Sequence, residues 1–467
     1  MLKILLIFFY ILFPILVIFV ERKNPTEAML WVIVLLCFPY VGIIFYLIFG
    51  STFSIKLVSF IRRKKLSKRM TITHNQIIDV KSHALSEIDK DVIHFNYVYN
   101  NAYLTCYDDI QIFTNGKDHY ESLLNDIRNA KKYIFIEFYT FHNDCVGEKF
   151  VYELTKKAKE GVYVLVMCDF IANIASTNKF FKPLLKAGGN VVRLKPFLTH
   201  FRSHRKIVTI DHEISYIGGM NIGKQYANMH KRKNPWRDTQ VRIKGRATSI
   251  LDEYFMRDWL CAINSKTFDE TVSYIKDIKL PEYSKTNNIC QFIIGGVDTN
   301  LESIKMCYLS MIRSAKKKIC IQSPYFIPDV SILDALKTAI AIGVDVEIMI
   351  PGVKASFFLD PVTNYYCGEL LKYGAKVYKY NGYIHAKTMI IDDEMCCIGS
   401  VNMDNRSLLV DDEVCGIFYS RKFVKEYNKI FNEDIKNCRI YSLEEFNNRS
   451  RKERIAECIF LPFSPLM

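Results

Sequence analysis

Two stretches of this chain repeat each other element by element, and this repeat limits the possible folds more than any other feature. Residues 130–141, AKKYIFIEFYTF, correspond to residues 315–326, AKKKICIQSPYF. Three more pairs follow in the same order: GVYVLVMCDF with GVDVEIMIPG, GGNVVRL with GAKVYKY, and HRKIVTIDHEISYIGGMN with HAKTMIIDDEMCCIGSVN. Because strand-like apolar runs alternate with amphipathic helical segments, each copy is predicted to form an α/β unit around a parallel or mixed sheet. We expect the two halves to pack about a pseudo-two-fold axis.

The repeat divides the chain into four parts. We expect a membrane anchor over residues 1–50, a basic membrane-proximal segment with a linker over 51–110, a first half over 111–280 and a second half over 281–467. The boundary between the halves is placed at the polar sequence LPEYSKTNN. The linker after residue 70 is of mixed polar composition, and its sequence predicts no role.

The first fifty residues are predicted to cross a membrane twice. Residues 1–20 carry one charge, Lys3, and the 22 residues from Ala28 to Phe49 carry none. At 1.5 Å per residue, the second run spans about 33 Å as a helix, which matches a hydrocarbon core of ~30 Å. A cleaved signal peptide is the alternative, but the apolar run is too long for one and a second span follows at once.

The charge pattern indicates an anionic partner. Lys and Arg exceed Asp and Glu by 14, which suits either nucleic acid or an acidic lipid surface. Seven Lys and Arg residues and no acidic residue lie in residues 51–70, directly after the second span. The positive-inside rule therefore places the long carboxy-terminal region in the cytoplasm. The same run is suited to contact anionic head groups, which favours lipid over nucleic acid.

Each half carries the pattern H-x-K-x4-D followed by G-[GS]-x-N. The members are His204, Lys206, Asp211, Gly218, Gly219 and Asn221 in the first half, and His385, Lys387, Asp392, Gly399, Ser400 and Asn402 in the second. A single copy would be weak evidence, whereas two copies at equivalent positions of a repeat are strong evidence for a site. Of the ten histidines, only His385 lies after residue 230, and it falls within the motif.

The spacing of the motif has a physical meaning. In a strand, residues i and i+2 point to the same face, so the His and Lys of each motif project together. The Asp lies seven positions after the His, an odd number, so Asp211 and Asp392 are expected to be structural or turn-forming residues behind the site. The glycines permit close approach of the backbone, and Asn221, Ser400 and Asn402 are expected to bind phosphate oxygens.

Two imidazoles and two ammonium groups at a pseudo-two-fold axis make a site for one phosphodiester. One imidazole can attack phosphorus, and the other can protonate the leaving alkoxide. The lysines would neutralise charge on the phosphoryl oxygens. A metal ion at the two histidines is disfavoured because a lysine lies two residues from each, and no cofactor is expected.

An imidazole used in this way needs a carboxylate on its other nitrogen. Asp238 follows His204 by 34 residues, and Glu413 follows His385 by 28. Both carboxylates precede an apolar strand, and we expect them to orient the imidazoles. Asp412 is the alternative to Glu413.

The paired motifs resemble those of the phospholipase D superfamily, and the chain is most similar to the bacterial cardiolipin synthases over nearly its whole length. The resemblance is carried by NPTEAMLWVIVLLCFPYVGIIFYLIFG, IEFYTF, SHRKIVTID, GGMNIG, WRDTQVRI, SPYFIP, GELLKYGAKVY, GSVNMDNRS and FLPFSPLM. It implies two phospholipase D-like α/β halves behind two transmembrane helices. It also implies transfer of a phosphatidyl group from one phosphatidylglycerol to another through a phosphatidyl-histidine, with release of glycerol.

The resemblance implies specific residue roles as well. It makes the His, Lys and Asp of both motifs active-site residues, including Asp211 and Asp392, and it favours His204 as the nucleophile. The sequence LLVDDE (408–413) departs from the family's usual apolar-polar-aromatic-Glu run. Other readings stay open at this point. Water or another alcohol could be the acceptor, as in a phospholipase D or a different phosphatidyltransferase, while the anchor argues against a nuclease and two complete motifs argue against a non-catalytic scaffold.

Overall fold

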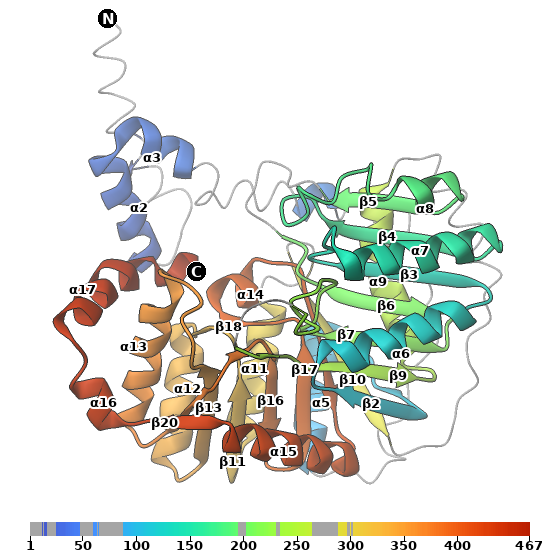
Figure 1. Ribbon diagram of the computed structural model, residues 1–467. Coiled ribbons are helices and arrows are strands. Elements are labelled where there is room, and N and C mark those ends of the chain that lie inside the picture. The colour runs from blue at the N-terminus through green and yellow to red at the C-terminus, as the bar shows by residue number, and fades with distance from the viewer. Residues whose placement is uncertain are drawn as a thin grey trace, which may run out of the picture.

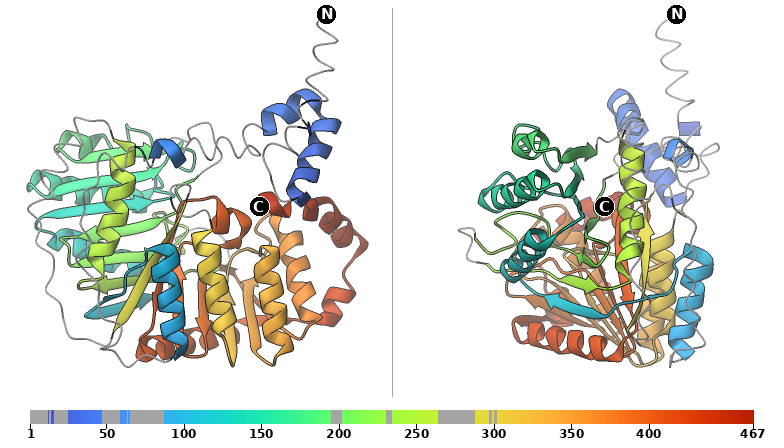
Figure 2. Two further views of the ribbon diagram at one scale, coloured as in Figure 1. Left: turned by 180° about the vertical axis from the view of Figure 1, so that it is seen from behind. Right: turned by 90° about the vertical axis from the view of Figure 1, so that its right-hand side faces the viewer.

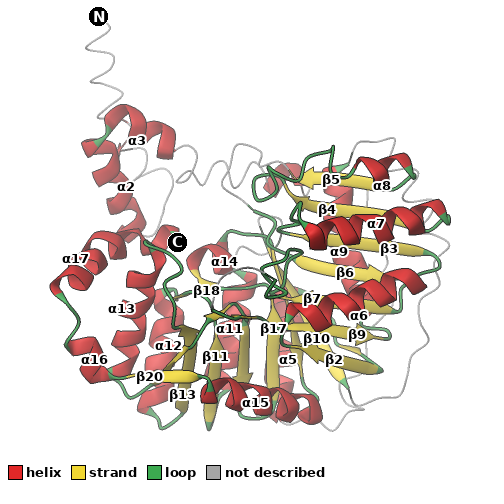
Figure 3. Cartoon of the chain, viewed as in Figure 1, coloured by secondary structure: helices red, strands yellow, loops and turns green. Residues whose placement is uncertain are grey.

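The computed structural model describes residues 12, 14–15, 25–46, 59–62, 64, 87–194, 202–229, 234–263, 288–296, 299 and 302–467. Two α/β units form the body of the molecule and lie side by side (Figure 1). Each unit has its own mixed sheet with helices packed against it (Figure 3). The predicted α/β architecture with two repeated halves is therefore confirmed.

The first half is built on a seven-stranded sheet with the order β2-β9-β7-β6-β3-β4-β5. Strands β3, β4 and β5 are parallel, and the remaining pairs are antiparallel. The strands are β2 (Asp109–Phe113), β3 (Tyr133–Phe138), β4 (Tyr163–Asp169), β5 (Asn190–Leu194), β6 (Lys206–Ile210), β7 (Ile214–Gly218) and β9 (Gln240–Lys244). Its helices are α6 (Gly116–Asn129), α7 (Cys145–Lys159), α8 (Lys182–Lys186) and α9 (Thr248–Ala262).

The second half is built on a nine-stranded sheet with the order β1-β10-β19-β17-β16-β11-β13-β14-β20. Without the two edge strands, this order matches the first sheet strand for strand, from β10 in place of β2 to β14 in place of β5. The strands are β1 (Thr105–Cys106), β10 (Ile289–Gly295), β11 (Lys318–Gln322), β13 (Asp345–Pro351), β14 (Lys376–Tyr380), β16 (Thr388–Ile391), β17 (Met395–Gly399), β19 (Glu413–Phe418) and β20 (Cys438–Tyr441). The helices are α11 (Ser303–Ser314), α12 (Val330–Ala341), α13 (Leu359–Leu371), α14 (Asn405–Leu409), α15 (Arg421–Lys436), α16 (Leu443–Asn447), α17 (Arg451–Phe460) and the 3₁₀ helix η3 (Leu461–Leu466).

Part of the expected linker packs onto the second half. Helix α5 (Glu87–Asn100) packs against α11, and β1 pairs antiparallel with β10. The side chain of Gln291 donates to the carbonyl oxygens of Ile93 and Ala102, at 3.1 and 2.8 Å. The chain therefore contributes to the core of its second half before it forms the first.

Side-chain caps begin several helices where the sequence supplies a short polar residue. The carboxylate of Asp144 accepts hydrogen bonds from the backbone N–H groups of Val146 and Gly147 at the start of α7. Ser450 and Glu453 form a reciprocal capping box at the start of α17. These caps satisfy N–H groups that have no partner within the helix.

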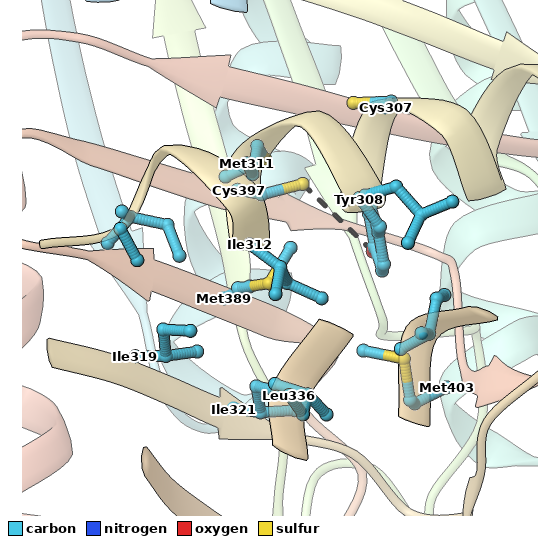
Figure 4. Packing of buried hydrophobic residues seen from close by; sticks show 14 of the residues in the cluster. Cys307, Tyr308, Met311, Ile312, Ile319, Ile321, Leu336, Met389, Cys397 and Met403 are labelled. Atoms are coloured by element: carbon cyan, nitrogen blue, oxygen red, sulfur yellow. Dashed lines mark hydrogen bonds between the residues drawn. The ribbon is translucent and has the colours of Figure 1, made fainter. Parts of the chain in front are cut away.

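A shared apolar core joins the two sheets. Phe135 of β3 stacks on Phe255 of α9 with ring centroids 5.0 Å apart, and the same cluster includes Phe292 and Phe418 of the second sheet. The view from behind shows α9 crossing the back of the first sheet (Figure 2). A separate core lies under α11 and α12, where Cys307, Tyr308, Met311 and their neighbours fill the space above the second sheet (Figure 4).

The amino-terminal apolar region forms two short helices in the residues that are described. Helix α2 (Pro25–Cys37) ends before Phe38, and α3 (Pro39–Phe45) begins after it. Proline disfavours the helical conformation in the residue that precedes it, and Phe38 has φ −134° and ψ 69°. The expected continuous helix over residues 28–49 is thus interrupted, while the expected span over residues 1–20 lies outside the described residues except at 12, 14 and 15. Within the described ranges, none of the helices has the length and apolarity needed to cross a membrane.

Candidate active site

Each motif histidine is attached to the other half through its backbone. The N–H of His204 donates to the carbonyl oxygen of Asp412 at 2.8 Å, and the N–H of His385 donates to that of Arg237 at 2.6 Å. Ser203 forms a parallel bridge with Asp412, while β15 (Tyr383–Ile384) pairs in parallel with β8 (Trp236–Arg237). The segment before each histidine therefore runs beside the segment before a carboxylate of the opposite half.

As a result, each motif histidine meets the orienting carboxylate of the opposite half. Nδ1 of His204 lies 2.8 Å from Oε1 of Glu413, and Nδ1 of His385 lies 2.6 Å from Oδ2 of Asp238. Proximity along the chain would pair Asp238 with His204 instead, and that pairing is wrong. A carboxylate at Nδ1 holds the proton on that nitrogen and leaves the Nε2 lone pair free. The side chain of Asp412, the alternative to Glu413, instead accepts hydrogen bonds from Arg62.

Each motif lysine reaches back to the backbone of its own histidine. Nζ of Lys206 donates to the carbonyl oxygen of His204, and Nζ of Lys387 donates to that of His385. Burial, together with the positive charge of Lys387, lowers the pKa of Lys206 to about 7, although Glu413 opposes the shift. Burial also lowers the pKa of Lys387 to about 8, against the attraction of Asp238 and Glu413.

Both imidazoles are neutral at neutral pH. Burial lowers the pKa of His204 well below its usual value, and the charges of Lys206 and Lys387 lower it further. Burial and Lys387 lower the pKa of His385 to about 3, even though Asp238 acts in the opposite direction. A neutral imidazole with a free Nε2 is the form that can act as a nucleophile or a base.

The two orienting carboxylates differ in their charge state. Burial raises the pKa of Glu413 to about 7, although Lys206 and a hydrogen bond from Ser400 oppose the rise. Burial also acts to raise the pKa of Asp238, but the charge and hydrogen bond of His385, together with Lys387, outweigh it and leave the pKa below its usual value. Asp238 is therefore firmly ionised at neutral pH, whereas Glu413 is close to its titration point.

The residues beside the two carboxylates differ as well. The hydroxyl of Ser400 donates to Oε2 of Glu413 and accepts a hydrogen bond from the N–H of Val414. The equivalent position in the first half is Gly219, where a Cβ atom would lie 2.2 Å from Oδ1 of Asp238. The glycine thus makes room for the shorter carboxylate, which also accepts from the N–H of Thr239 at 2.8 Å.

The side chains of the three residues expected to bind phosphate differ in the hydrogen bonds that they make within the protein. The amide of Asn221 is engaged at both ends, since Oδ1 accepts from the N–H of Thr140 and Nδ2 donates to the hydroxyl of Tyr226. The hydroxyl of Ser400 is engaged with Glu413. The phosphate-binding roles of Asn221 and Ser400 stay predictions. Asn402 keeps a buried Oδ1 with no hydrogen-bond partner. This oxygen is an acceptor, so a phosphate contact from Asn402 would have to come from its Nδ2.

Asp211 and Asp392 lie at the far ends of their strands. The carboxylate of Asp211 accepts hydrogen bonds from the N–H groups of Lys131, Lys132 and Tyr133 at 2.7–2.9 Å. Asp392 makes the equivalent bonds to the segment before β11. Seven extended residues span about 23 Å, so neither Asp reaches its histidine. The role that the resemblance implied is wrong for both, and the structural role expected from the spacing is the one observed.

Aromatic rings that the sequence analysis did not single out surround the histidines. The ring of Tyr139 lies 4.9 Å from that of His204, and Trp236 lies 5.1 Å from His385. Tyr226 and Tyr383 lie 6.0 Å from the ring of His385. Three of these rings lie in segments close to the motifs or the carboxylates, namely IEFYTF, WRDTQ and NGYIHAK, and this position was the signal that could have indicated them. Tyr226 follows the first motif in NIGKQYANM.

Buried ion pairs behind the site were also missed. Arg205 pairs with Asp258 of α9, and Arg237 pairs with Asp434 of α15 at 2.7 Å. The two aspartates occupy equivalent positions on equivalent helices, so comparing the repeats beyond the motifs could have indicated them. In the part of the chain that the structure describes, no group of three His, Cys, Asp or Glu side chains is placed to hold a metal ion.

Known proteins with similar sequences carry the same arrangement of parts. The family model for "Cardiolipin synthase, PLD-like domain" matches residues 123–259 and 308–435, and that for "Phospholipase_D-nuclease N-terminal" matches residues 4–51. The major cardiolipin synthase of Bacillus subtilis is 37% identical over 98% of this chain and 97% of its own length. A cardiolipin synthase of Listeria welshimeri is 34% identical over 100% and 99%.

Among solved structures, the phosphatidylserine synthase of Haemophilus influenzae matches the fold. Its TM-score is 0.63 at 15% sequence identity, and the match covers 81% of this chain and 100% of that protein. At this identity the likeness concerns the arrangement of the two halves alone.

Proposed function

The chain belongs to the cardiolipin synthases of the phospholipase D superfamily, and on this premise we propose that its two crossed His–carboxylate pairs carry out the transfer. The reaction moves a phosphatidyl group from one phosphatidylglycerol to another and yields cardiolipin and glycerol. The observation that carries the assignment of the site is the pairing of each motif imidazole, through Nδ1, with a buried carboxylate of the opposite half.

The first step forms a bond between phosphorus and one imidazole. Nε2 of the nucleophilic histidine, which we propose to be His204 because the family resemblance favours it, attacks the phosphodiester phosphorus. The bond from phosphorus to the glycerol oxygen breaks, and His385 delivers a proton to that oxygen, so glycerol leaves as a neutral alcohol. His385 is neutral in the free enzyme. The anionic phosphodiester must therefore raise its pKa on binding so that it carries the proton it donates.

The second step reverses the roles. A hydroxyl of a second phosphatidylglycerol attacks the phosphorus of the phosphatidyl-histidine while His385, now neutral, accepts its proton. The phosphorus–nitrogen bond breaks, and cardiolipin is released with His204 restored. The ionised carboxylates at Nδ1 stabilise positive charge on each ring, and Lys206 and Lys387 neutralise charge on the phosphoryl oxygens.

The location of the enzyme is part of the proposal. We propose two membrane-spanning helices with the catalytic body in the cytoplasm, and anionic lipid as the surface beside it. The uncharged run Ala28–Phe49 and the seven basic residues that follow it support this arrangement. Several apolar side chains of α2 and α3 are more than half exposed, among them Met29, Ile33, Tyr40 and Ile44. A lipid environment would cover such a surface.

A product assay tests the proposed function. Purified full-length enzyme in vesicles that contain phosphatidylglycerol should yield cardiolipin and glycerol in equal amounts. Phosphatidic acid without cardiolipin would identify a phospholipase D-type hydrolase instead. A product formed only with another added alcohol would identify a different phosphatidyltransferase.

Replacement of either histidine tests the two-histidine mechanism. His204→Ala and His385→Ala should each lower turnover by at least about a thousandfold, since each removes a nucleophile or a general acid. Rapid quenching in alkaline detergent, which preserves the acid-labile phosphorus–nitrogen bond, should trap covalent phosphate from phosphorus-labelled lipid in His385→Ala but not in His204→Ala. Wild-type turnover in either variant would contradict the mechanism, and the opposite labelling pattern would make His385 the nucleophile.

A further inference from the structure

A residue of the basic membrane-proximal segment reaches the catalytic body. Residues 59–62 are helical, and this short helix lies apart from α2 and α3, over the body of the molecule (Figure 2). Nη1 of Arg62 lies 3.0 and 2.8 Å from the two carboxylate oxygens of Asp412. The Arg62 side chain is 25% exposed and that of Asp412 only 4%, so the ion pair is largely shielded from water.

Asp412 is attached directly to the His204 side of the site. Its N–H donates to the carbonyl oxygen of Arg202 at 2.9 Å, and its own carbonyl oxygen accepts from the N–H of His204 at 2.8 Å. The next residue, Glu413, holds Nδ1 of His204. A shift of Asp412 would therefore move both the backbone partner and the side-chain partner of His204.

Asp412 lies among other buried acidic groups. Asp411 and Glu413 on either side are buried carboxylates whose pKa values burial raises to about 7. The Asp412 side chain also packs against Gly296, where a Cβ atom would lie 2.2 Å from Oδ1. Arg205 also approaches this position, since the same Cβ atom would lie 3.3 Å from its Nη2, but that guanidinium already pairs with Asp258. Loss of Arg62 would therefore remove the direct ion-pair partner of a buried carboxylate that has two other carboxylates beside it.

The other half differs at the equivalent position. Arg237, which precedes Asp238 as Asp412 precedes Glu413, pairs with Asp434 of α15 within the body. The partner of the His385 side thus comes from the catalytic halves themselves. The partner of the His204 side comes from the segment that follows the membrane anchor.

We propose that Arg62 is a positioning residue for the transfer reaction, which couples the membrane-proximal segment to His204 through Asp412 and Glu413. The inference rests on the proposed role of His204. Arg62, one residue of the basic run, would then do more than contact lipid head groups. In the sequence DDE at 411–413, Asp412 would bind Arg62 and Glu413 would orient His204.

Steady-state kinetics with phosphatidylglycerol vesicles test the proposal. Arg62→Ala should lower kcat about tenfold or more, because displacement of a catalytic group by ~1 Å costs up to about a hundredfold. Lys64→Ala is the matched control, since it removes one positive charge from the same segment. Both variants should share any rise in KM that comes from weaker attraction to anionic vesicles, but only Arg62→Ala should lose kcat.

Two further variants separate positioning from folding. Arg62→Lys should restore most of kcat, because it returns the charge beside Asp412. Asp412→Asn should also lower kcat, and the double variant Arg62→Ala/Asp412→Asn should be no slower than the slower single variant. Multiplicative losses in the double variant, or equal kcat in Arg62→Ala and Lys64→Ala, would overturn the proposal. Failure of the wild-type enzyme to form cardiolipin would instead overturn the proposed function, which the same assay reports separately.

Discussion

The two halves share a backbone plan but give their histidines different chemical surroundings. In both, the histidine N–H donates to the residue before the opposing carboxylate, and the lysine donates to the histidine carbonyl oxygen. His204 faces a glutamate that receives a serine hydroxyl, and His385 faces an aspartate beside a glycine. The duplicated fold therefore fixes the positions of the groups, while single substitutions set their proton affinities.

This difference suits two roles in one reaction. Asp238 is ionised throughout the neutral range and can stabilise a protonated His385 continuously. Glu413, with a pKa of about 7, supports positive charge on His204 only once it has lost its own proton. We therefore expect substitutions around His204 and substitutions around His385 to impair different steps of the transfer.

After loss of either histidine, the largest expected effect comes from removing the carboxylates one at a time. Asp238→Asn and Glu413→Gln should each lower kcat about a hundredfold or more, because each imidazole loses the group that fixes its tautomer. Asp238→Asn should impair the same step as His385→Ala, and Glu413→Gln the same step as His204→Ala, in rapid-quench measurements of covalent phosphate. The opposite correspondence would mean that the crossed hydrogen bonds do not operate during the reaction.

Exchange of the small residues beside the carboxylates should have a smaller effect. Ser400→Ala removes a hydrogen bond to Glu413 and should lower kcat/KM about tenfold. Gly219→Ser places a Cβ atom against the Asp238 carboxylate and should lower kcat/KM at least as much. Gly219→Ala is the matched control, since it adds the Cβ alone. If Gly219→Ala were fully active, the close approach would not be what the glycine provides.

The pH profile should show the asymmetry directly. The kcat/KM of the free enzyme should rise through about pH 7 as Glu413 ionises, because only the anion can stabilise positive charge on His204. It should fall again as Lys206, with a pKa of about 7, and Lys387, with a pKa of about 8, lose their charge. The result is a narrow bell, since Glu413 and Lys206 titrate as a pair.

Variants assign the acidic limb of that bell. Ser400→Ala should move it to higher pH, because the lost hydrogen bond normally lowers the pKa of Glu413. Asp238→Asn should lower the rate and leave the position of the limb unchanged. If the acidic limb disappeared in Asp238→Asn, the group that titrates would be Asp238 and not Glu413.

The smallest effect on activity is expected at the third motif residue. Asp211→Asn and Asp392→Asn each weaken three backbone hydrogen bonds to a carboxylate and should cost about 2 kcal/mol of unfolding free energy. At temperatures where the variants stay folded, kcat should change less than about threefold, since neither group is near a histidine. Thermal unfolding and kinetics of the same preparations check both statements, and a large loss of kcat in a fully folded variant would contradict them.

Sequence reasoning was accurate wherever the evidence was local or repeated. The odd spacing predicted a structural role for Asp211 and Asp392, and both carboxylates bind the backbone ahead of a neighbouring strand. The same approach failed where a side chain finds its partner by folding. Nothing in the order of residues shows that the hydroxyl of Ser400 turns to Glu413, or that the amide of Asn221 is used up by Thr140 and Tyr226.

The sequence by itself determined the duplicated α/β architecture, the family, and the paired His and Lys, because periodicity and motif spacing are properties of short segments. The exchange of Asp238 and Glu413 between the histidines was decided only by the tertiary structure. Its physical reason is that the segments before each motif histidine and before each opposing carboxylate run in parallel between the two halves. The contact of Arg62 with Asp412 was decided in the same way, since it joins residues 350 positions apart that only the folded chain brings together.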